Sequence, residues 1–189
     1  AWRRVDGEGP TVVWLGGYRS DMTGTKAVAL EAQARALDVG FLRFDYSGHG
    51  QSSGHYTDGT ISLWLEESLA VIDRLATGRL VLVGFSQGTM MSLHVAPRRE
   101  VPLAGVIGYS GLLTFADKLA VEKKNTPPVL LVHGTADDVV PFPSMAAAQH
   151  VLQQNGFAVQ TLACPGVGHG IDEAGIETGL GFLLRVLNR

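Results

Sequence analysis

Residues 80–93 read LVLVGFSQGTMMSL, and this stretch decides the fold of the chain. Its first four residues are apolar, as in a buried strand, and residues 89–95 have the composition of the start of a helix. The sequence Gly84-Phe85-Ser86-Gln87-Gly88 stands between them, with a glycine on each side of the turn. The stretch therefore predicts a buried strand that passes through a sharp turn directly into a helix.

Apolar runs and helical patterns alternate in both directions from this stretch. Strand-like runs lie at residues 11–15, 41–46, 80–83, 103–109, 128–132 and 158–163. Helical patterns lie at residues 25–37, 61–76, 89–95, 115–121, 144–154 and 171–186, with Thr23 or Thr25 available to cap the first of them. This alternation predicts an α/β fold with about six mostly parallel strands and helices on both faces, in one domain over residues 1–189.

Composition and charge exclude several classes of protein. With 46% hydrophobic and 17% charged residues, the 189-residue chain has ample apolar surface to fold. A net charge of −3 argues against a basic surface for nucleic acid. Cys164 is the only cysteine, which excludes an internal disulfide and a Cys-rich zinc site. No His, Asp or Glu spacing is typical of zinc ligands, so we expect neither metal nor cofactor.

The sequence carries little information about location and assembly. No run approaches the roughly 20 apolar residues that a membrane span needs. Residues 1–5 do not begin a signal peptide, because Asp6, Gly7 and Glu8 follow where an apolar run is required. The default expectation is a cytoplasmic protein that acts on a small molecule, and the oligomeric state has no signature.

Ser86 is the candidate nucleophile. It lies in a G-x-S-x-G pattern between a buried strand and a helix, which is the setting that exposes a serine hydroxyl at the top of a sheet. Ser52 lies in a second match to the pattern at residues 50–54, but a polar loop precedes it and no helical pattern follows, so it is interpreted as a solvated loop residue. The alternative for Ser86 is a tight strand-to-helix crossover without chemistry.

A serine nucleophile needs a base to take its proton and an acid to orient that base. The strand at 128–132 runs into a polar segment with adjacent candidates Asp137 and Asp138, either of which is alternatively a turn residue. The strand at 158–163 leads to a glycine-rich loop that holds the candidate base His169, whose alternative is an ordinary surface histidine. His133, at a strand end, is interpreted as a structural residue that supports the turn containing Asp137 and Asp138.

The reaction also needs two backbone N–H groups that bind the oxyanion of the tetrahedral intermediate. One is expected from Gln87, directly after the nucleophile. The other is expected from Tyr18, in the glycine-containing loop after the strand at 11–15, although an unremarkable loop would look the same. Three apolar residues are candidates for the substrate pocket or, equally, for the core: Phe85, Met90 and Leu112.

With these residues in place, the whole chain resembles an α/β-hydrolase of the serine esterase and thioesterase kind. Residues 11–83, with LGGYRSDMTGTKA at 15–27 and RFDYSGHG at 43–50, resemble the acyl-glucuronide esterase and palmitoyl-protein thioesterase branch. Residues 84–189, with GFSQGTMM at 84–91, HGTADDVVP at 133–141 and GVGHG at 166–170, resemble the phospholipase/carboxylesterase branch. One hypothesis from this division is a mosaic or engineered recombinant chain with a junction near Val83.

The resemblance implies Ser86 as nucleophile, Asp137 rather than Asp138 as acid and His169 as base, with Tyr18 and Gln87 as oxyanion donors. Many relatives insert a helical cap after the strand at 103–109, whereas this chain has a connection of only about 15 residues there. The implied activity is hydrolysis of carboxylic esters, or of thioesters, with small or short-chain acyl groups through an acyl-enzyme. The alternative is a catalytically silent relative that binds a ligand or acts as a scaffold.

Overall fold

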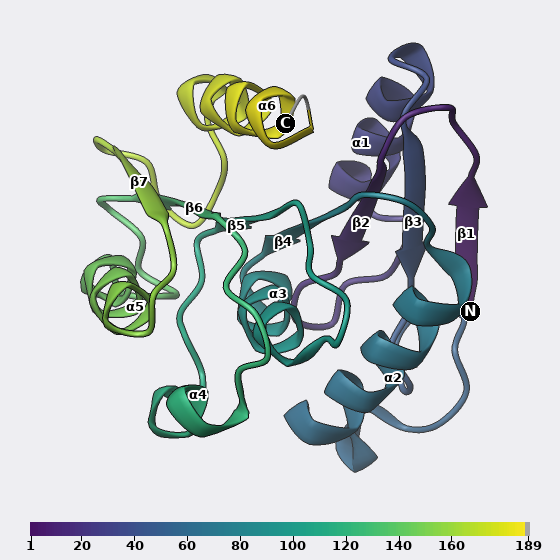
Figure 1. Ribbon diagram of the computed structural model, residues 1–189, viewed down its shortest axis with the longest axis horizontal. Coiled ribbons are helices and arrows are strands. Elements are labelled where there is room, and N and C mark those ends of the chain that lie inside the picture. The colour runs from purple at the N-terminus through teal and green to yellow at the C-terminus, as the bar shows by residue number, and fades with distance from the viewer. Residues whose placement is uncertain (188–189) are drawn as a thin grey trace.

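The computed structural model describes residues 1–187, which form an open seven-stranded sheet with helices on both faces (Figure 1). The strands are β1 (Trp2–Val5), β2 (Thr11–Leu15), β3 (Gly40–Phe44), β4 (Leu80–Phe85), β5 (Gly105–Tyr109), β6 (Val129–Gly134) and β7 (Val159–Cys164). Their spatial order is β1-β3-β2-β4-β5-β6-β7. β1 is antiparallel to β3, whereas β2 to β7 are parallel, so the carboxyl ends of these parallel strands lie along one edge of the sheet.

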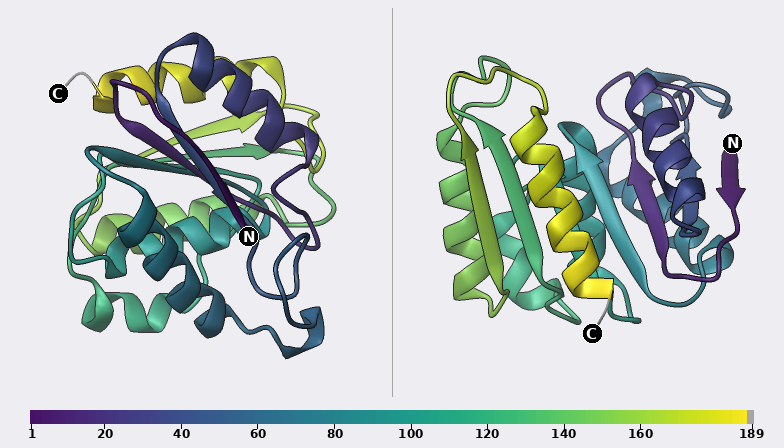
Figure 2. Two further views of the ribbon diagram at one scale, coloured as in Figure 1. Left: turned by 90° about the vertical axis from the view of Figure 1, so that its right-hand side faces the viewer. Right: turned by 90° about the horizontal axis from the view of Figure 1, so that it is seen from above.

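The helices form two layers. Helices α1 (Thr25–Ala36) and α6 (Glu173–Leu187) lie on one face, and both lie in front of the sheet in the view from above (Figure 2). The other face carries α2 (Ile61–Leu75), α3 (Gln87–Arg98), α4 (Ala116–Glu122) and α5 (Pro143–Gln154). A short 3-10 helix, η1 (Tyr56–Asp58), lies in the long loop that precedes α2.

Each face of the sheet has its own hydrophobic core. Along β2, Val13 and Leu15 belong to the core under α2, α3 and α5, whereas Val12 and Trp14 belong to the core under α1 and α6. Burying such a side chain fully contributes about 1.5–3 kcal/mol. Because both faces of the central strands are covered, their sequences are continuous apolar runs without the alternation of a half-exposed strand.

The predicted fold class is confirmed, and two details of it were wrong. The prediction missed β1, because its four residues are mostly exposed and its pairing with β3 is a tertiary interaction. The expected threonine cap of α1 is also wrong: the N-cap is Gly24, which has no side chain to accept a hydrogen bond, and the Thr23 hydroxyl donates to Asp21 instead.

Within residues 1–187, no helix combines the length and the apolar character that crossing a bilayer requires.

His94 makes the stability of the fold depend on pH. It lies on α3 with only 5% of its surface exposed, and burial together with the positive charge of Arg98 lowers its pKa to about 4. An unfolded chain binds a proton at this imidazole below about pH 6.5, whereas the folded chain does not until about pH 4. The free energy of unfolding is therefore expected to fall as the pH drops through this window.

The variant His94→Gln removes this titration. Between pH 7 and pH 4.5, we expect its free energy of unfolding to decrease by about 2 kcal/mol less than that of the wild type. Urea denaturation of both proteins at the two pH values measures this difference. Equal losses in the two proteins would contradict the assignment to His94.

Candidate active site

Ser86 lies in the tight turn between β4 and α3, which we call the elbow (residues 84–88). Its backbone has φ 56° and ψ −120°, a left-handed conformation that is unfavourable for a residue with a side chain. A Cβ at Gly84 would collide with the backbone of Gly88, and a Cβ at Gly88 would collide with the carbonyl of Leu15. The two glycines of the pattern therefore allow the elbow to pack tightly and to present the serine hydroxyl.

His169 approaches Ser86 from the loop between β7 and α6. Its Nε2 atom lies 3.0 Å from Ser86 Oγ. The imidazole also packs against the ring of Phe85, with a distance of 4.9 Å between ring centroids. The structure thus brings together two residues that are 83 positions apart in the sequence.

Asp137 lies on the other side of the same imidazole. Its Oδ2 and Oδ1 atoms are 2.9 Å and 3.1 Å from His169 Nδ1, and its side chain is fully buried. The backbone N–H groups of Val139 and Val140 donate to Oδ1 at 2.9 Å each. Asp138, the alternative acid, is exposed.

The surroundings of Asp137 favour its charged form. Burial alone would raise the pKa of this carboxyl group, but the hydrogen bond from His169 and those from the N–H groups of Val140 and Val139 together hold the pKa below its ordinary value. The carboxylate is an acceptor only, so His169 Nδ1 carries the proton and Nε2 is free to accept one from Ser86.

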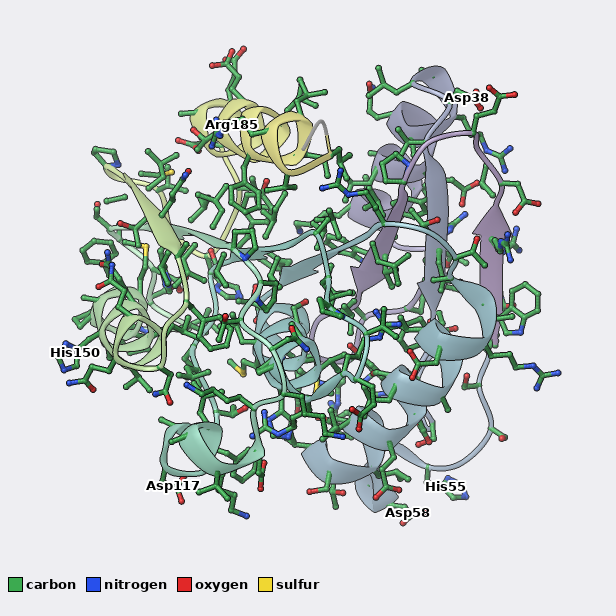
Figure 3. All side chains as sticks on the ribbon, in the orientation of Figure 1. Asp38, His55, Asp58, Asp117, His150 and Arg185 are labelled. Carbon is green, nitrogen blue, oxygen red and sulfur yellow. The ribbon has the colours of Figure 1, made fainter. Side chains whose placement is uncertain are left out.

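His133 contacts Asp137 from the end of β6. Its Nε2 atom lies 2.9 Å from the carbonyl oxygen of Val140 and 3.2 Å from Asp137 Oδ2, and only 2% of its side chain is exposed. Both neighbours accept hydrogen bonds, so Nε2 carries a proton. His133 thereby links the Asp137 side chain to the backbone of Val140. His55 and His150 lie at the periphery of the molecule (Figure 3).

Ser52, in the second match to the serine pattern, lies in a loop that hydrogen bonds hold in place. Ser52 Oγ donates to the carbonyl oxygen of Asp45 at 2.7 Å. The carboxylate of Asp45 accepts hydrogen bonds from the N–H groups of Met22 and Gln51. These contacts hold the loop of Ser52 against the residues that precede α1.

A cleft of about 440 Å³ opens beside Ser86 and His169. Tyr18 and Phe85 are among its lining residues, and Gly17 approaches the carbonyl oxygen of Phe85 closely, so the loop after β2 lies against the elbow. Gln87 is buried at the first position of α3. Met90 and Leu112 are partly buried and are not among the lining residues of this cleft.

The sequence did not reveal one wall of the cleft. This wall comes from Trp14 and from the segment that leads into α1, and Lys26 Nζ lies 4.3 Å from the centre of the Phe85 ring. No motif marks these residues, because their role depends on where α1 packs. Within residues 1–187, no group of three or more His, Cys, Asp or Glu side chains is arranged to hold a metal ion.

Comparisons with known proteins agree with this fold. A model of the phospholipase/carboxylesterase family matches residues 50–186. The human protein named mitochondrial palmitoyl-protein thioesterase ABHD10 is 40% identical over 131 residues, which are 69% of this chain and 42% of that protein. Acyl-protein thioesterase 1 of Neurospora crassa is 33% identical over 96 residues, 48% of this chain and 39% of that protein. The chain thus spans about two fifths of the length of these curated relatives.

Solved structures extend the similarity over nearly the whole chain. The crystal structure of esterase PE8 has a TM-score of 0.80 and 29% identity and covers 98% of both chains. Mouse alpha/beta hydrolase domain-containing protein 10 has a TM-score of 0.81 at 24% identity, covers 99% of this chain and 93% of that chain, and shows the fold.

Two expectations gain no support from these matches. The family match begins at residue 50, and the alignment with the human protein is longer than the segment before Val83, so neither marks a boundary there. The human relative is named as a mitochondrial protein, which does not support the expected cytoplasmic location. The sheet, the elbow and the family match over residues 50–186 together establish that this chain belongs to the phospholipase/carboxylesterase family of the α/β-hydrolases.

Proposed function

We propose that this chain is a serine hydrolase that cleaves carboxylic esters, or thioesters, through an acyl-enzyme. One observation carries the proposal: an unbroken series of hydrogen bonds runs from Ser86 Oγ through His169 to Asp137. The three residues follow β4, β7 and β6, so they meet at the carboxyl edge of the sheet, where ligands of open α/β sheets bind. Esterases and thioesterases among the relatives support the reaction class.

We assign a role to each side chain on the basis of this geometry. Ser86 Oγ attacks the substrate carbonyl while His169 Nε2, at 3.0 Å, takes the hydroxyl proton. The imidazolium then gives this proton to the leaving alcohol or thiol. Asp137 holds the proton on Nδ1 and stabilises the imidazolium with its negative charge. Water enters next, loses a proton to His169 and releases the acid from Ser86.

The oxyanion that forms at the carbonyl oxygen needs donors on the opposite side from His169. We assign these donors to the backbone N–H groups of Gln87 and Tyr18. Gln87 begins α3, so its N–H lies at the positive end of the helix, next to the nucleophile. Tyr18 lies in a turn closed by the hydrogen bond from Ser20 N–H to the Gly17 carbonyl, against the elbow.

The open cleft favours small or short-chain acyl substrates. The connection between β5 and β6 contains only the short helix α4, so no helical cap covers the elbow within residues 1–187. Phe85 and Trp14 offer apolar contact, whereas a long acyl chain would leave much of its surface in water. A panel of esters and thioesters graded by acyl length tests this: we expect kcat/KM to be highest for short chains. A steady rise toward long chains would contradict it.

Labelling with a fluorophosphonate separates an active hydrolase from a silent binding protein. The reagent reacts with a serine only where a base activates the hydroxyl. We expect one covalent adduct by intact mass, placed at Ser86 by peptide mapping and absent from Ser86→Ala. The variant Ser52→Ala is the matched control and should label like the wild type. An unlabelled wild type would favour a silent ligand-binding or scaffolding relative.

A further inference from the structure

Ser110 adopts a backbone conformation that serine normally avoids. It follows β5, has a φ of 49°, and is completely buried. Left-handed positions of this kind are usually taken by glycine, and the next residue in the chain is Gly111. Gly111 has its own reason to lack a side chain, because a Cβ there would collide with Thr89. The serine at position 110 therefore calls for an explanation in its hydroxyl group.

The hydroxyl of Ser110 forms a hydrogen bond with the loop between β7 and α6 that carries His169, which we call the base loop (residues 165–172). Its Oγ donates to the carbonyl oxygen of Gly170 at 3.2 Å, across 60 positions of sequence, and Gly170 directly follows His169. A second hydrogen bond holds the loop on the N-terminal side of His169. The N–H of Ala136, the residue before Asp137, donates to the carbonyl oxygen of Val167 at 2.9 Å. The two bonds thus fix the backbone on either side of His169.

The end of β5, residues 109–110, also forms hydrogen bonds with Ser86 and β6. The carbonyl oxygen of Tyr109 accepts a hydrogen bond from the N–H of Ser86 at 2.9 Å, and the N–H of Ser110 donates to the carbonyl oxygen of Val132 on β6 at 2.9 Å. Two consecutive residues at the end of β5 are therefore bonded to the elbow, to β6 and to the base loop. A displacement of Tyr109 and Ser110 would therefore change the distance between Ser86 Oγ and His169 Nε2.

The composition of the loop that carries His169 gives such a bond a role in holding the loop in place. Glycines stand at positions 166, 168 and 170, on both sides of the imidazole-bearing residue. Glycine gives a loop more accessible backbone conformations than any other residue. A base on such a loop remains at hydrogen-bonding distance from its nucleophile only if contacts from outside the loop hold it there.

We infer that Ser110 is a positioning residue, whose hydroxyl holds the His169 loop at the distance that proton transfer from Ser86 requires. This inference rests on the proposed hydrolase function. Ser110 touches no reacting atom and acts only through the backbone next to His169. The competing explanation is a buried serine that merely satisfies its own hydroxyl and contributes only to folding.

Two variants separate the hydroxyl from the strained backbone. Ser110→Ala removes the hydroxyl and keeps the strain, whereas Ser110→Gly removes the hydroxyl and relieves the strain. We expect both to lower kcat for a short-chain ester by about tenfold with little change in KM. Ser110→Gly should have the higher melting temperature of the two. If Ser110→Ala folds poorly, Ser110→Gly still tests the effect of removing the hydroxyl.

The matched control is Ser68→Ala. Ser68 is also completely buried, and its hydroxyl donates to a backbone carbonyl, that of Trp64, on helix α2. We expect this variant to keep wild-type kcat even if its melting temperature falls. A comparable loss of kcat in Ser68→Ala would show that any lost buried hydroxyl has this effect, and it would overturn the inference.

A double-mutant cycle with His169→Ala gives the decisive result. If Ser110 acts through the imidazole, then Ser110→Ala has no further effect on the residual hydrolysis of an activated ester by His169→Ala. A full tenfold loss in that background, or wild-type kcat in both Ser110 variants, would overturn the inference. A wild type that hydrolyses no ester or thioester would instead refute the proposed function itself, so the two failures are distinguishable.

Discussion

Replacing Ser86 by alanine is expected to lower kcat/KM for every ester substrate by roughly 10⁴–10⁶-fold. The variant has no hydroxyl to attack the carbonyl, so the acyl-enzyme cannot form and only water can react. The fold should be unaffected, because alanine and serine are similar in size and the hydroxyl is bonded only to His169 among the hydrogen bonds of residues 1–187. Initial rates with an activated short-chain ester measure the effect.

The melting temperature of Ser86→Ala shows whether the loss comes from chemistry. We expect it to lie within a few degrees of the wild type, since surface and partly exposed substitutions usually change stability by less than about 1 kcal/mol. Substrate binding should also persist, with KM or an inhibition constant close to the wild-type value. Residual kcat above about one hundredth of the wild type would remove Ser86 from the role of nucleophile.

Replacing Asp137 by asparagine is expected to lower kcat by about 10³–10⁴-fold. The carboxylate accepts hydrogen bonds from His169 Nδ1 and from two backbone N–H groups, and an amide has only one oxygen for these donors. The amide N–H₂ group then favours the imidazole tautomer with its proton on Nε2. That tautomer cannot take the proton of Ser86, so the variant should bind substrate and turn it over very slowly.

Asp138→Asn is the matched control for this prediction. The two carboxylates are adjacent in sequence, but Asp138 is exposed while the side chain of Asp137 is fully buried against His169. We expect Asp138→Asn to retain wild-type kcat within about twofold. Equal losses in both variants, or a greater loss in Asp138→Asn, would contradict the assignment of the acid.

Local sequence was sufficient for the elements that carry the site. Residues 80–93 combine a buried strand, two glycines and a helix start, and the structure needs each glycine for a close backbone contact. The positions of Asp137 and His169 after two other strands also follow from local pattern. Their meeting at Ser86 follows from parallel pairing, because parallel strands end at the same edge of the sheet.

Other features depend on packing that no local pattern encodes. The register of β1 against β3 arises where elements far apart in the sequence meet. The same is true of the contact between Lys26 and Phe85 at the cleft. Ser110 could be predicted even less from local sequence, because Tyr109-Ser110-Gly111 is typical of an ordinary strand end. Its left-handed backbone and its bond to Gly170 appear only when β5 and the base loop are placed together.

The short antiparallel strand β1 has a consequence for the behaviour of the protein in concentrated solution. An unpaired strand edge is a template on which a second chain can add, which begins aggregation. The edge of β3 would be a strong template, since Phe41, Leu42 and Phe44 are apolar. β1 covers that edge and presents Arg3 and Arg4 to solvent in its place. Among the strands formed by residues 1–187, the outermost one on this side of the sheet is therefore short and positively charged, which discourages growth into fibrils.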